Sequence, residues 1–174
     1  MTEVQTNSTE PGLTGLFLTF VLDGGHYGVP ILSVREIIAM HAITELPRLP
    51  DYVKGVINLR GKIIPVIDLR LRFGLQAPPH DRSTCIVVLD VELTDGSMTN
   101  VGCIVDTVSE VADINGDDIQ APPSMGDGVK LDSIQGLAKC DGGKRVVSLI
   151  DVNVVLAQLV EDPDMRRMTE EADV

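Results

Sequence analysis

The chain has 174 residues, of which 44% are hydrophobic and only 3% aromatic. A chain of this length buries a sizeable core as one domain or two joined lobes, and a core of valine, isoleucine and leucine favours strands. The formal net charge is −12, which argues against nucleic acid or direct binding to an anionic membrane, because both repel an acidic protein. A basic protein partner fits better.

The cysteines and the two ends of the chain indicate the compartment in which the protein is expected to work. Three separated cysteines, Cys85, Cys103 and Cys140, match neither a disulfide framework nor a zinc motif, which favours the reduced cytoplasm. Residues 1–15 are polar and lack the pattern of a secretion signal, so we expect a disordered N-terminal segment. We expect an acidic C-terminal tail over 161–174, and no apolar run reaches the roughly 18 residues of a membrane helix.

The folded domain is therefore predicted over 16–160, beginning with a β-hairpin. Residues 16–22 are dense in strand formers, Asp23-Gly24-Gly25 is a turn sequence, and His26–Pro30 is predicted as the second strand. A short helix is predicted next, over Ile31–Ile38, because its apolar residues follow three-and-four spacing.

A second hairpin is predicted from Gly55–Leu59 and Ile63–Ile67, with Arg60 at its tip. Asp68 is placed to cap a short helix that ends before Gly74. A linker near 76–84 then leads to further strands, which are predicted over Cys85–Leu93 and Val101–Val105.

The second half of the chain repeats the pattern of the first. Tyr27–Ile37 aligns with Val101–Val111, sharing glycine, valine and glutamate at matching places, and the 55–69 region resembles 136–152. A pattern used twice predicts two similar β-lobes, each closed to hide its sheet edges. The copies differ at the hairpin tip, where only the first carries Arg60, and a feature of one copy alone favours a function.

Glu36 and Arg60 therefore have two interpretations. They are either a charged pair on a surface that binds a partner, or a surface salt bridge worth about 0–1 kcal/mol. Their spacing in the sequence does not decide between these interpretations. The region 48–72 is locally basic, with six arginine or lysine residues against two aspartates. The apolar residues Ile31, Val34 and Ile38 suit a groove for a partner helix, although ordinary core packing is the more frequent explanation.

No catalytic or metal template fits the sequence. His26, His41 and His80 are not at ligand spacing, and the acidic stretch from Asp113 has Asp118 where a calcium loop needs glycine. Phosphate-loop and nucleophile motifs are also missing. We therefore expect a protein that is not an enzyme and has no cofactor or metal.

Several segments together resemble the CheW family of chemotaxis coupling proteins. The most specific is the run Gly-Val-Ile-Asn-Leu-Arg-Gly from Gly55 to Gly61 with its continuation to Arg70. The resemblance extends over about residues 16–159 and also includes Tyr27–Val29, Val34–Ile38, Phe73–Leu75, Val101–Gly102, Val105–Val111 and Leu149–Asp151.

The resemblance implies a mainly β fold of two SH3-like five-stranded β-barrel lobes with a few short helices. It implies an adaptor that couples the cytoplasmic hairpin tips of chemoreceptors to the regulatory domain of the histidine kinase CheA in signalling arrays, reaching the membrane only through partners. By motif, the receptor-binding positions fall on Arg60, Glu36, Val34, Gly55, Asn58 and Leu59. The kinase-binding residues are not assigned.

Three alternatives stay open at this point. An adaptor of a chemosensory array outside chemotaxis has the same module. A CheV-like protein adds a receiver domain, for which we expect no room in this chain. A small-ligand-binding β-barrel protein needs convergent polar residues in a cleft, and the sequence offers only scattered candidates.

Overall fold

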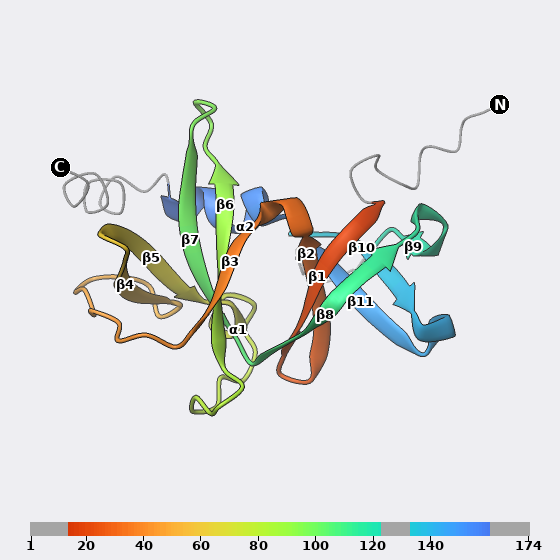
Figure 1. Ribbon diagram of the computed structural model, residues 1–174, viewed down its shortest axis with the longest axis horizontal. Helices are drawn as coiled ribbons and strands as arrows, with labels where there is room; N and C mark the ends of the chain where they lie inside the picture. The colour runs from red at the N-terminus through yellow and green to blue at the C-terminus, as the bar shows by residue number, and fades with distance from the viewer. Residues whose placement is uncertain (1–13, 123–132, 161–174) are drawn as a thin grey trace.

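The computed structural model describes residues 14–122 and 133–160 and shows two β-lobes side by side (Figure 1). The predicted N-terminal segment, except Thr14 and Gly15, and the predicted acidic tail lie outside the described residues. Within the described residues, no helix is long and apolar enough to cross a membrane.

Lobe 1 is one sheet with the strand order β8-β1-β2-β11-β10-β9. Its strands are β1 Gly15–Leu22, β2 Gly25–Pro30, β8 Thr107–Ile114, β9 Ile119–Gln120, β10 Ile134–Cys140 and β11 Arg145–Ile150. Two 3-10 turns belong to it, η4 Gly116–Asp118 and η5 Asp141–Gly143.

Lobe 2 is a sheet with the order β3-β6-β7-β5-β4. Its strands are β3 Val34–Ala39, β4 Val53–Leu59, β5 Lys62–Asp68, β6 Cys85–Glu92 and β7 Met98–Val105. The remaining elements are η3 Ile31–Ser33 and the helices α1 Leu69–Arg72 and α2 Val152–Val160.

This architecture confirms the predicted mainly β fold of two SH3-like lobes. Lobe 2 has the expected five strands, whereas lobe 1 gains a sixth, the two-residue β9. Asp68 caps α1 as predicted, since its carboxylate accepts a hydrogen bond from the backbone N–H of Arg70.

The predicted helix over Ile31–Ile38 is wrong. Only Ile31–Ser33 forms a 3-10 turn, and Val34–Ala39 is strand β3. The burial of β3 alternates residue by residue, and β3 pairs antiparallel with β6. Branched apolar residues beside an available sheet edge form a strand, so tertiary pairing overrides the weak helical spacing.

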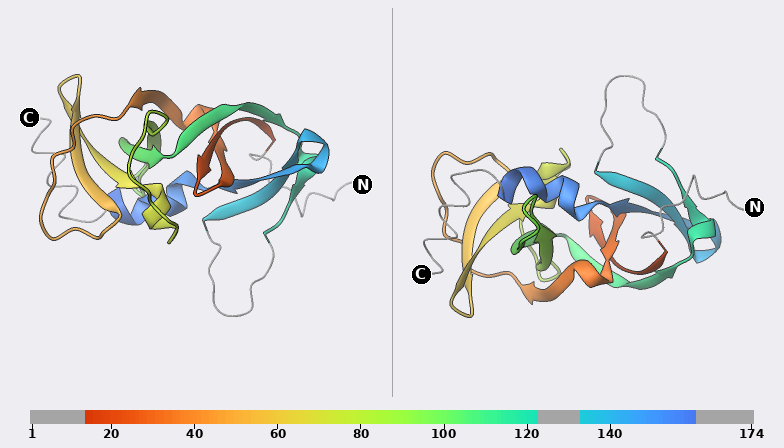
Figure 2. Two further views of the ribbon diagram at one scale, coloured as in Figure 1. Left: turned by 90° about the horizontal axis from the view of Figure 1, so that it is seen from below. Right: turned by 90° about the horizontal axis from the view of Figure 1, so that it is seen from above.

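The two halves of the chain exchange strands between the lobes. β1 and β2 pair with β8 and β11 in lobe 1, whereas β3, β4 and β5 join β6 and β7 in lobe 2 (Figure 2). The aligned stretches Tyr27–Ile37 and Val101–Val111 are the two crossings, from β2 to β3 and from β7 to β8. The linker near 76–84 joins α1 to β6 and does not separate the lobes.

Three apolar clusters form the core. One fills lobe 1 around Phe17 and Leu149, and one fills lobe 2 around Ile57 and Ile86. The third lies between the lobes and includes residues of β1, β6, β7 and α2. Strand β6 contributes alternate residues to two of these clusters, which explains why Cys85–Leu93 is apolar almost throughout.

Arg70 is a fully buried arginine where the lobes meet. Its guanidinium donates to both carboxylate oxygens of Asp68 at 2.9 Å, to Asp106 Oδ1 at 2.7 Å and to the Pro78 carbonyl at 3.2 Å. Asp106 lies between β7 and β8, and it also accepts a hydrogen bond from the backbone of Asp23 in the β1–β2 turn. One cation therefore connects both lobes and the 76–84 linker.

Arg70→Ala is expected to lower the free energy of unfolding by about 3–5 kcal/mol, because it leaves the buried carboxylate of Asp68 and the half-buried one of Asp106 without their cation. Urea denaturation followed by circular dichroism measures the change. Arg82→Ala, which removes an exposed arginine, is the control and is expected to stay within about 0.5 kcal/mol of the parent. Equal effects of the two variants contradict the role of Arg70.

Candidate functional site

The β4–β5 hairpin tip presents Arg60 on a two-residue turn. Leu59 pairs with Lys62, and the two residues between them both have positive φ, 55° for Arg60 and 86° for Gly61. This is the geometry of a type I′ turn, which suits the twist of the flanking strands. The Asn58 side chain accepts a hydrogen bond from the Gly61 backbone N–H at 2.8 Å, so Asn58 holds the turn.

Arg60 forms a two-pronged ion pair with Glu36 of β3. Its Nη1 lies 2.5 Å from Oε2, and its Nη2 lies 2.7 Å from Oε1. β3 and β4 are the two edge strands of the lobe 2 sheet. The ion pair therefore links the two edges of this sheet, and we call this contact the closure of lobe 2. The Arg60 side chain is 72% exposed and that of Glu36 is 23% exposed, which leaves the guanidinium on the outside.

The ion pair sets the acidity of Glu36. The hydrogen bonds from Arg60 lower the pKa of the Glu36 carboxyl, against a smaller opposing effect of partial burial, and the charges of Arg60 and Arg35 lower it further. A carboxyl whose pKa is lower in the folded state stabilises the fold at neutral pH, and that contribution is lost as the pH falls through the lowered pKa.

Arg60→Ala is therefore expected to raise the pKa of Glu36 toward its ordinary value, because the main hydrogen-bond donor is gone. The measurement is an NMR titration of the Glu36 side-chain carboxyl carbon in both proteins. Arg82→Ala is expected to leave this pKa unchanged. An unshifted Glu36 in the Arg60 variant indicates that the pair does not form in solution.

The ion pair borders a shallow pocket of about 400 Å³ at the end of lobe 2. Besides the pair, the pocket is lined by Arg35, Leu59, Lys62, Ile64, Val88 and Asn100. Four of the six predicted receptor-binding residues, Glu36, Asn58, Leu59 and Arg60, thus lie on or beside this end of the lobe. Val34 is half-buried and packs against the core between the lobes.

Gly55, the remaining predicted site residue, is buried at a β-bulge near the start of β4. Its φ is 140°, and a Cβ there would collide with the carbonyl oxygen of Thr44. This close approach allows Thr44 to form a bridge with Val56, with N–H···O distances of 2.9 and 3.0 Å. Gly55 therefore shapes the hairpin through its backbone.

Gly55→Ala is expected to cost at least about 2 kcal/mol more stability than Gly61→Ala. Both glycines have positive φ, but a Cβ on Gly61 has no atom within 4 Å, so only the Gly55 change adds a collision. Thermal unfolding of the two variants measures the difference. Similar melting temperatures for both rule out the close approach as the reason for glycine at position 55.

Lobe 1 carries a counterpart of the ion pair that the sequence comparison missed. Glu110 of the edge strand β8 accepts a hydrogen bond at 2.8 Å from Nη2 of Arg145, which begins β11 on the far side of lobe 1. The sequence hides it because the arginine stands at the start of β11, after a longer turn, instead of at the tip. A Glu–Arg closure is thus shared by both lobes, and uniqueness to one copy does not hold for the pair itself.

The two closures differ in which group faces solvent. In lobe 1 the carboxylate of Glu110 is 54% exposed and Arg145 only 22%, the reverse of lobe 2. Asp141 lies 3.3 Å from Arg145 and is also exposed. Lobe 2 therefore presents a cation at its closure, whereas lobe 1 presents anions.

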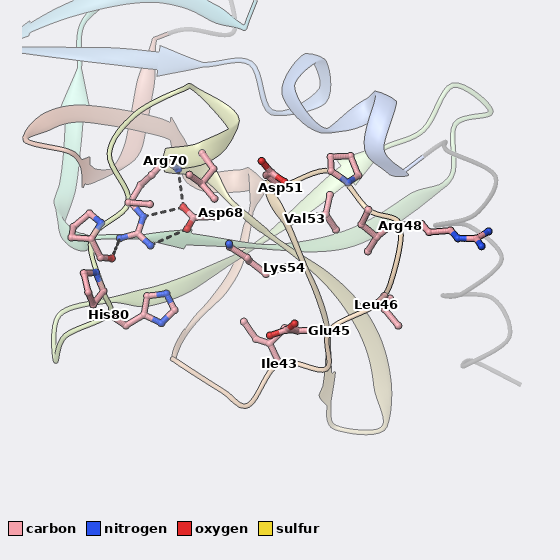
Figure 3. A pocket seen from close by; sticks show the side chains of 16 residues that line it. Ile43, Glu45, Leu46, Arg48, Asp51, Val53, Lys54, Asp68, Arg70 and His80 are labelled. Atoms are coloured by element: carbon pink, nitrogen blue, oxygen red, sulfur yellow. Dashed lines mark hydrogen bonds and ion pairs between the residues drawn. The ribbon is translucent and has the colours of Figure 1, made fainter.

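A larger groove of about 660 Å³ lies on another side of lobe 2, between the segments 43–51 and 77–80 (Figure 3). Ile43, Leu46 and Val53 give it apolar walls, whereas Lys54 and Glu45 give it charges of both signs. This groove was not predicted from the sequence. In the part of the chain that the structure describes, no group of three His, Cys, Asp or Glu side chains is placed to hold a metal ion.

Comparison with known proteins agrees with this geometry. The family model described as "CheW-like domain" matches residues 16–160. The chain belongs to the CheW-like domain family. It is 35% identical to a chemotaxis protein CheW of Klebsiella aerogenes, covering 81% of each chain. It is also 33% identical to a chemotaxis protein CheW of Helicobacter pylori, covering 80% of each.

A solved structure with the same fold is the scaffolding protein TtCheW from Thermoanaerobacter tengcongensis. The TM-score is 0.72 at 32% sequence identity, over 83% of this chain and 93% of that one. The predicted family and fold are thereby confirmed, as is the predicted role of a chemotaxis coupling adaptor at the level of the family.

Proposed function

We propose that this chain bridges the cytoplasmic hairpin tips of chemoreceptors to the regulatory domain of the histidine kinase CheA. It acts in the cytoplasm, is held at receptor arrays by these partners, and works by binding, without catalysis, cofactor, metal or nucleic acid. The observation that carries the receptor half of the proposal is Arg60, an exposed guanidinium held on a rigid turn by Glu36.

Pre-organisation makes Arg60 a suitable contact. The positive-φ turn, the Asn58 bond to Gly61 and the two-pronged pair with Glu36 fix the side chain before a partner arrives. A group that is already ordered loses less conformational entropy on binding. A guanidinium has five N–H donors in a plane, so those not used by Glu36 are available to carboxylates or carbonyls of a helical hairpin.

The other predicted site residues divide by what they are placed to do. Leu59 is half-buried beside Arg60 and supplies an apolar contact. Val34 and Glu36 contribute from β3, at the border between the lobe 2 closure and the core between the lobes. Asn58 and Gly55 act on the receptor site by holding the hairpin in shape.

Arg60→Ala is expected to weaken binding of a chemoreceptor cytoplasmic fragment more than about tenfold while leaving CheA binding within about twofold. Pull-down followed by titration calorimetry with each partner measures this. Thermal unfolding shows whether the variant is folded, and Arg82→Ala is the matched control for removing an exposed arginine.

Three outcomes contradict parts of the proposal. A parent protein that captures neither partner contradicts the coupling function for these partners. A folded Arg60 variant that binds the receptor fragment normally contradicts the role of this arginine. Equal loss of both partners indicates that the hairpin tip is not specific to the receptor.

A further inference from the structure

At the closure of lobe 2, the acidic side chains are mostly covered by protein and the basic side chains are exposed to solvent. Glu36 and Asp90 are largely covered, whereas Arg60 and Arg35 are 72% and 63% exposed. Lys62 is exposed beside them, and all three cations line the same pocket. The chain has a net charge of −12, but the exposed charges at this end of lobe 2 are positive.

A β-bulge turns Arg35 toward this pocket. Val34 pairs with Leu89 and Glu36 with Val88, so Arg35 is the extra residue between two consecutive partners on β6. Bulges locally re-aim side chains that regular alternation would point elsewhere. Arg35 Nε then lies 3.7 Å from Asp90 Oδ1, which places its guanidinium over the pocket rim with Arg60.

Lys62 is placed by a chain of polar contacts. Its ammonium donates to Asn100 Oδ1 at 3.4 Å, and Asn100 Nδ2 donates to Asp90 Oδ1 at 2.5 Å. Asn100 is buried, so Asp90 and Asn100 form a covered base for both Lys62 and Arg35. The contacts of these two cations are long compared with those of Arg60, which leaves them able to turn toward a partner.

Lobe 1 has the opposite arrangement, so the charge of the group exposed at the closure differs between the two lobes. There Glu110 is exposed and Arg145 is covered, although the strands correspond and the ion pair is of the same kind. An ion pair can link the strands of a lobe whether its arginine or its glutamate is the exposed partner. The extra cations Arg35 and Lys62 are therefore not needed to close lobe 2.

We propose that Arg35, Arg60 and Lys62 form a three-cation patch that recognises an acidic face of the chemoreceptor hairpin, with a carboxylate for each cation. This inference rests on the proposed receptor binding and names two further contact residues and the chemistry of the partner face. Arg60 supplies the fixed contact, while Arg35 and Lys62 attract the acidic face and adjust to it. Such rim charges mainly raise the association rate and its sensitivity to salt.

The test uses the full chain and the cytoplasmic hairpin fragment of a chemoreceptor encoded in the same genome. Arg35→Ala, Lys62→Ala, their double variant and Arg60→Ala are titrated with the fragment at 50 mM and 500 mM NaCl. Arg82→Ala is the matched control. Arg82 precedes the Cys85 end of β6, whereas Asp90, which contacts Arg35, lies toward the other end of that strand.

Each of Arg35→Ala and Lys62→Ala is expected to weaken binding about two- to fivefold at low salt, mostly through slower association. The double variant is expected to lose more than either, and the differences are expected to shrink at high salt because ions screen exposed charges. Replacing glutamates of the fragment tip by glutamine is expected to remove the effect of the Arg35 and Lys62 changes.

The outcomes separate this inference from the proposed function. A parent protein that does not bind the fragment overturns both. If Arg60→Ala loses binding while Arg35→Ala and Lys62→Ala match the parent at both salt concentrations, the patch is overturned and the receptor site stands. Losses that are equal at low and high salt also overturn the patch, because the effect is then not electrostatic.

Discussion

The buried cation Arg70 is the constraint on which the arrangement of the two lobes depends. It is bonded to Asp68 and Asp106, and it lies beside an apolar cluster that draws residues from both lobes. Apolar packing provides most of the attraction but little direction. A guanidinium with fixed donors supplies direction, because its carboxylates must stand at defined places. The end of lobe 2 that carries Arg60 is thereby held at a fixed position relative to lobe 1.

Each lobe also has to solve the problem of an open sheet edge. Both use a glutamate on an edge strand and an arginine of a hairpin across the lobe, Glu36 with Arg60 in the β4–β5 turn and Glu110 with Arg145 at the start of β11. An exposed pair of this kind adds little stability, so its main effect is geometric. The choice of which partner faces outward then determines the charge that each lobe shows to other molecules.

Much of this was readable from the sequence. Strong β-former runs, glycine turns and the Asp68 cap predicted most elements, and the repeat predicted two lobes. The β3 strand was missed because six residues are too few to separate the two periodicities without knowing that β6 lies alongside. The Glu110–Arg145 pair and the Arg70–Asp106 bond join residues 35 and 36 positions apart, and no local pattern reports such contacts. The bulge that turns Arg35 is likewise invisible without the partner strand.

The exchange of strands between the halves of the chain has a consequence for the order in which the protein is made. β1 and β2 leave the ribosome well before their neighbours β8 and β11, whose paired residues lie 86 to 121 positions later. Lobe 1 therefore cannot close until nearly the whole domain has been synthesised, and early strand edges wait unpaired. Contacts between distant segments slow folding, so the apolar strand β1 depends on rapid completion of the chain or on protection until β8 arrives.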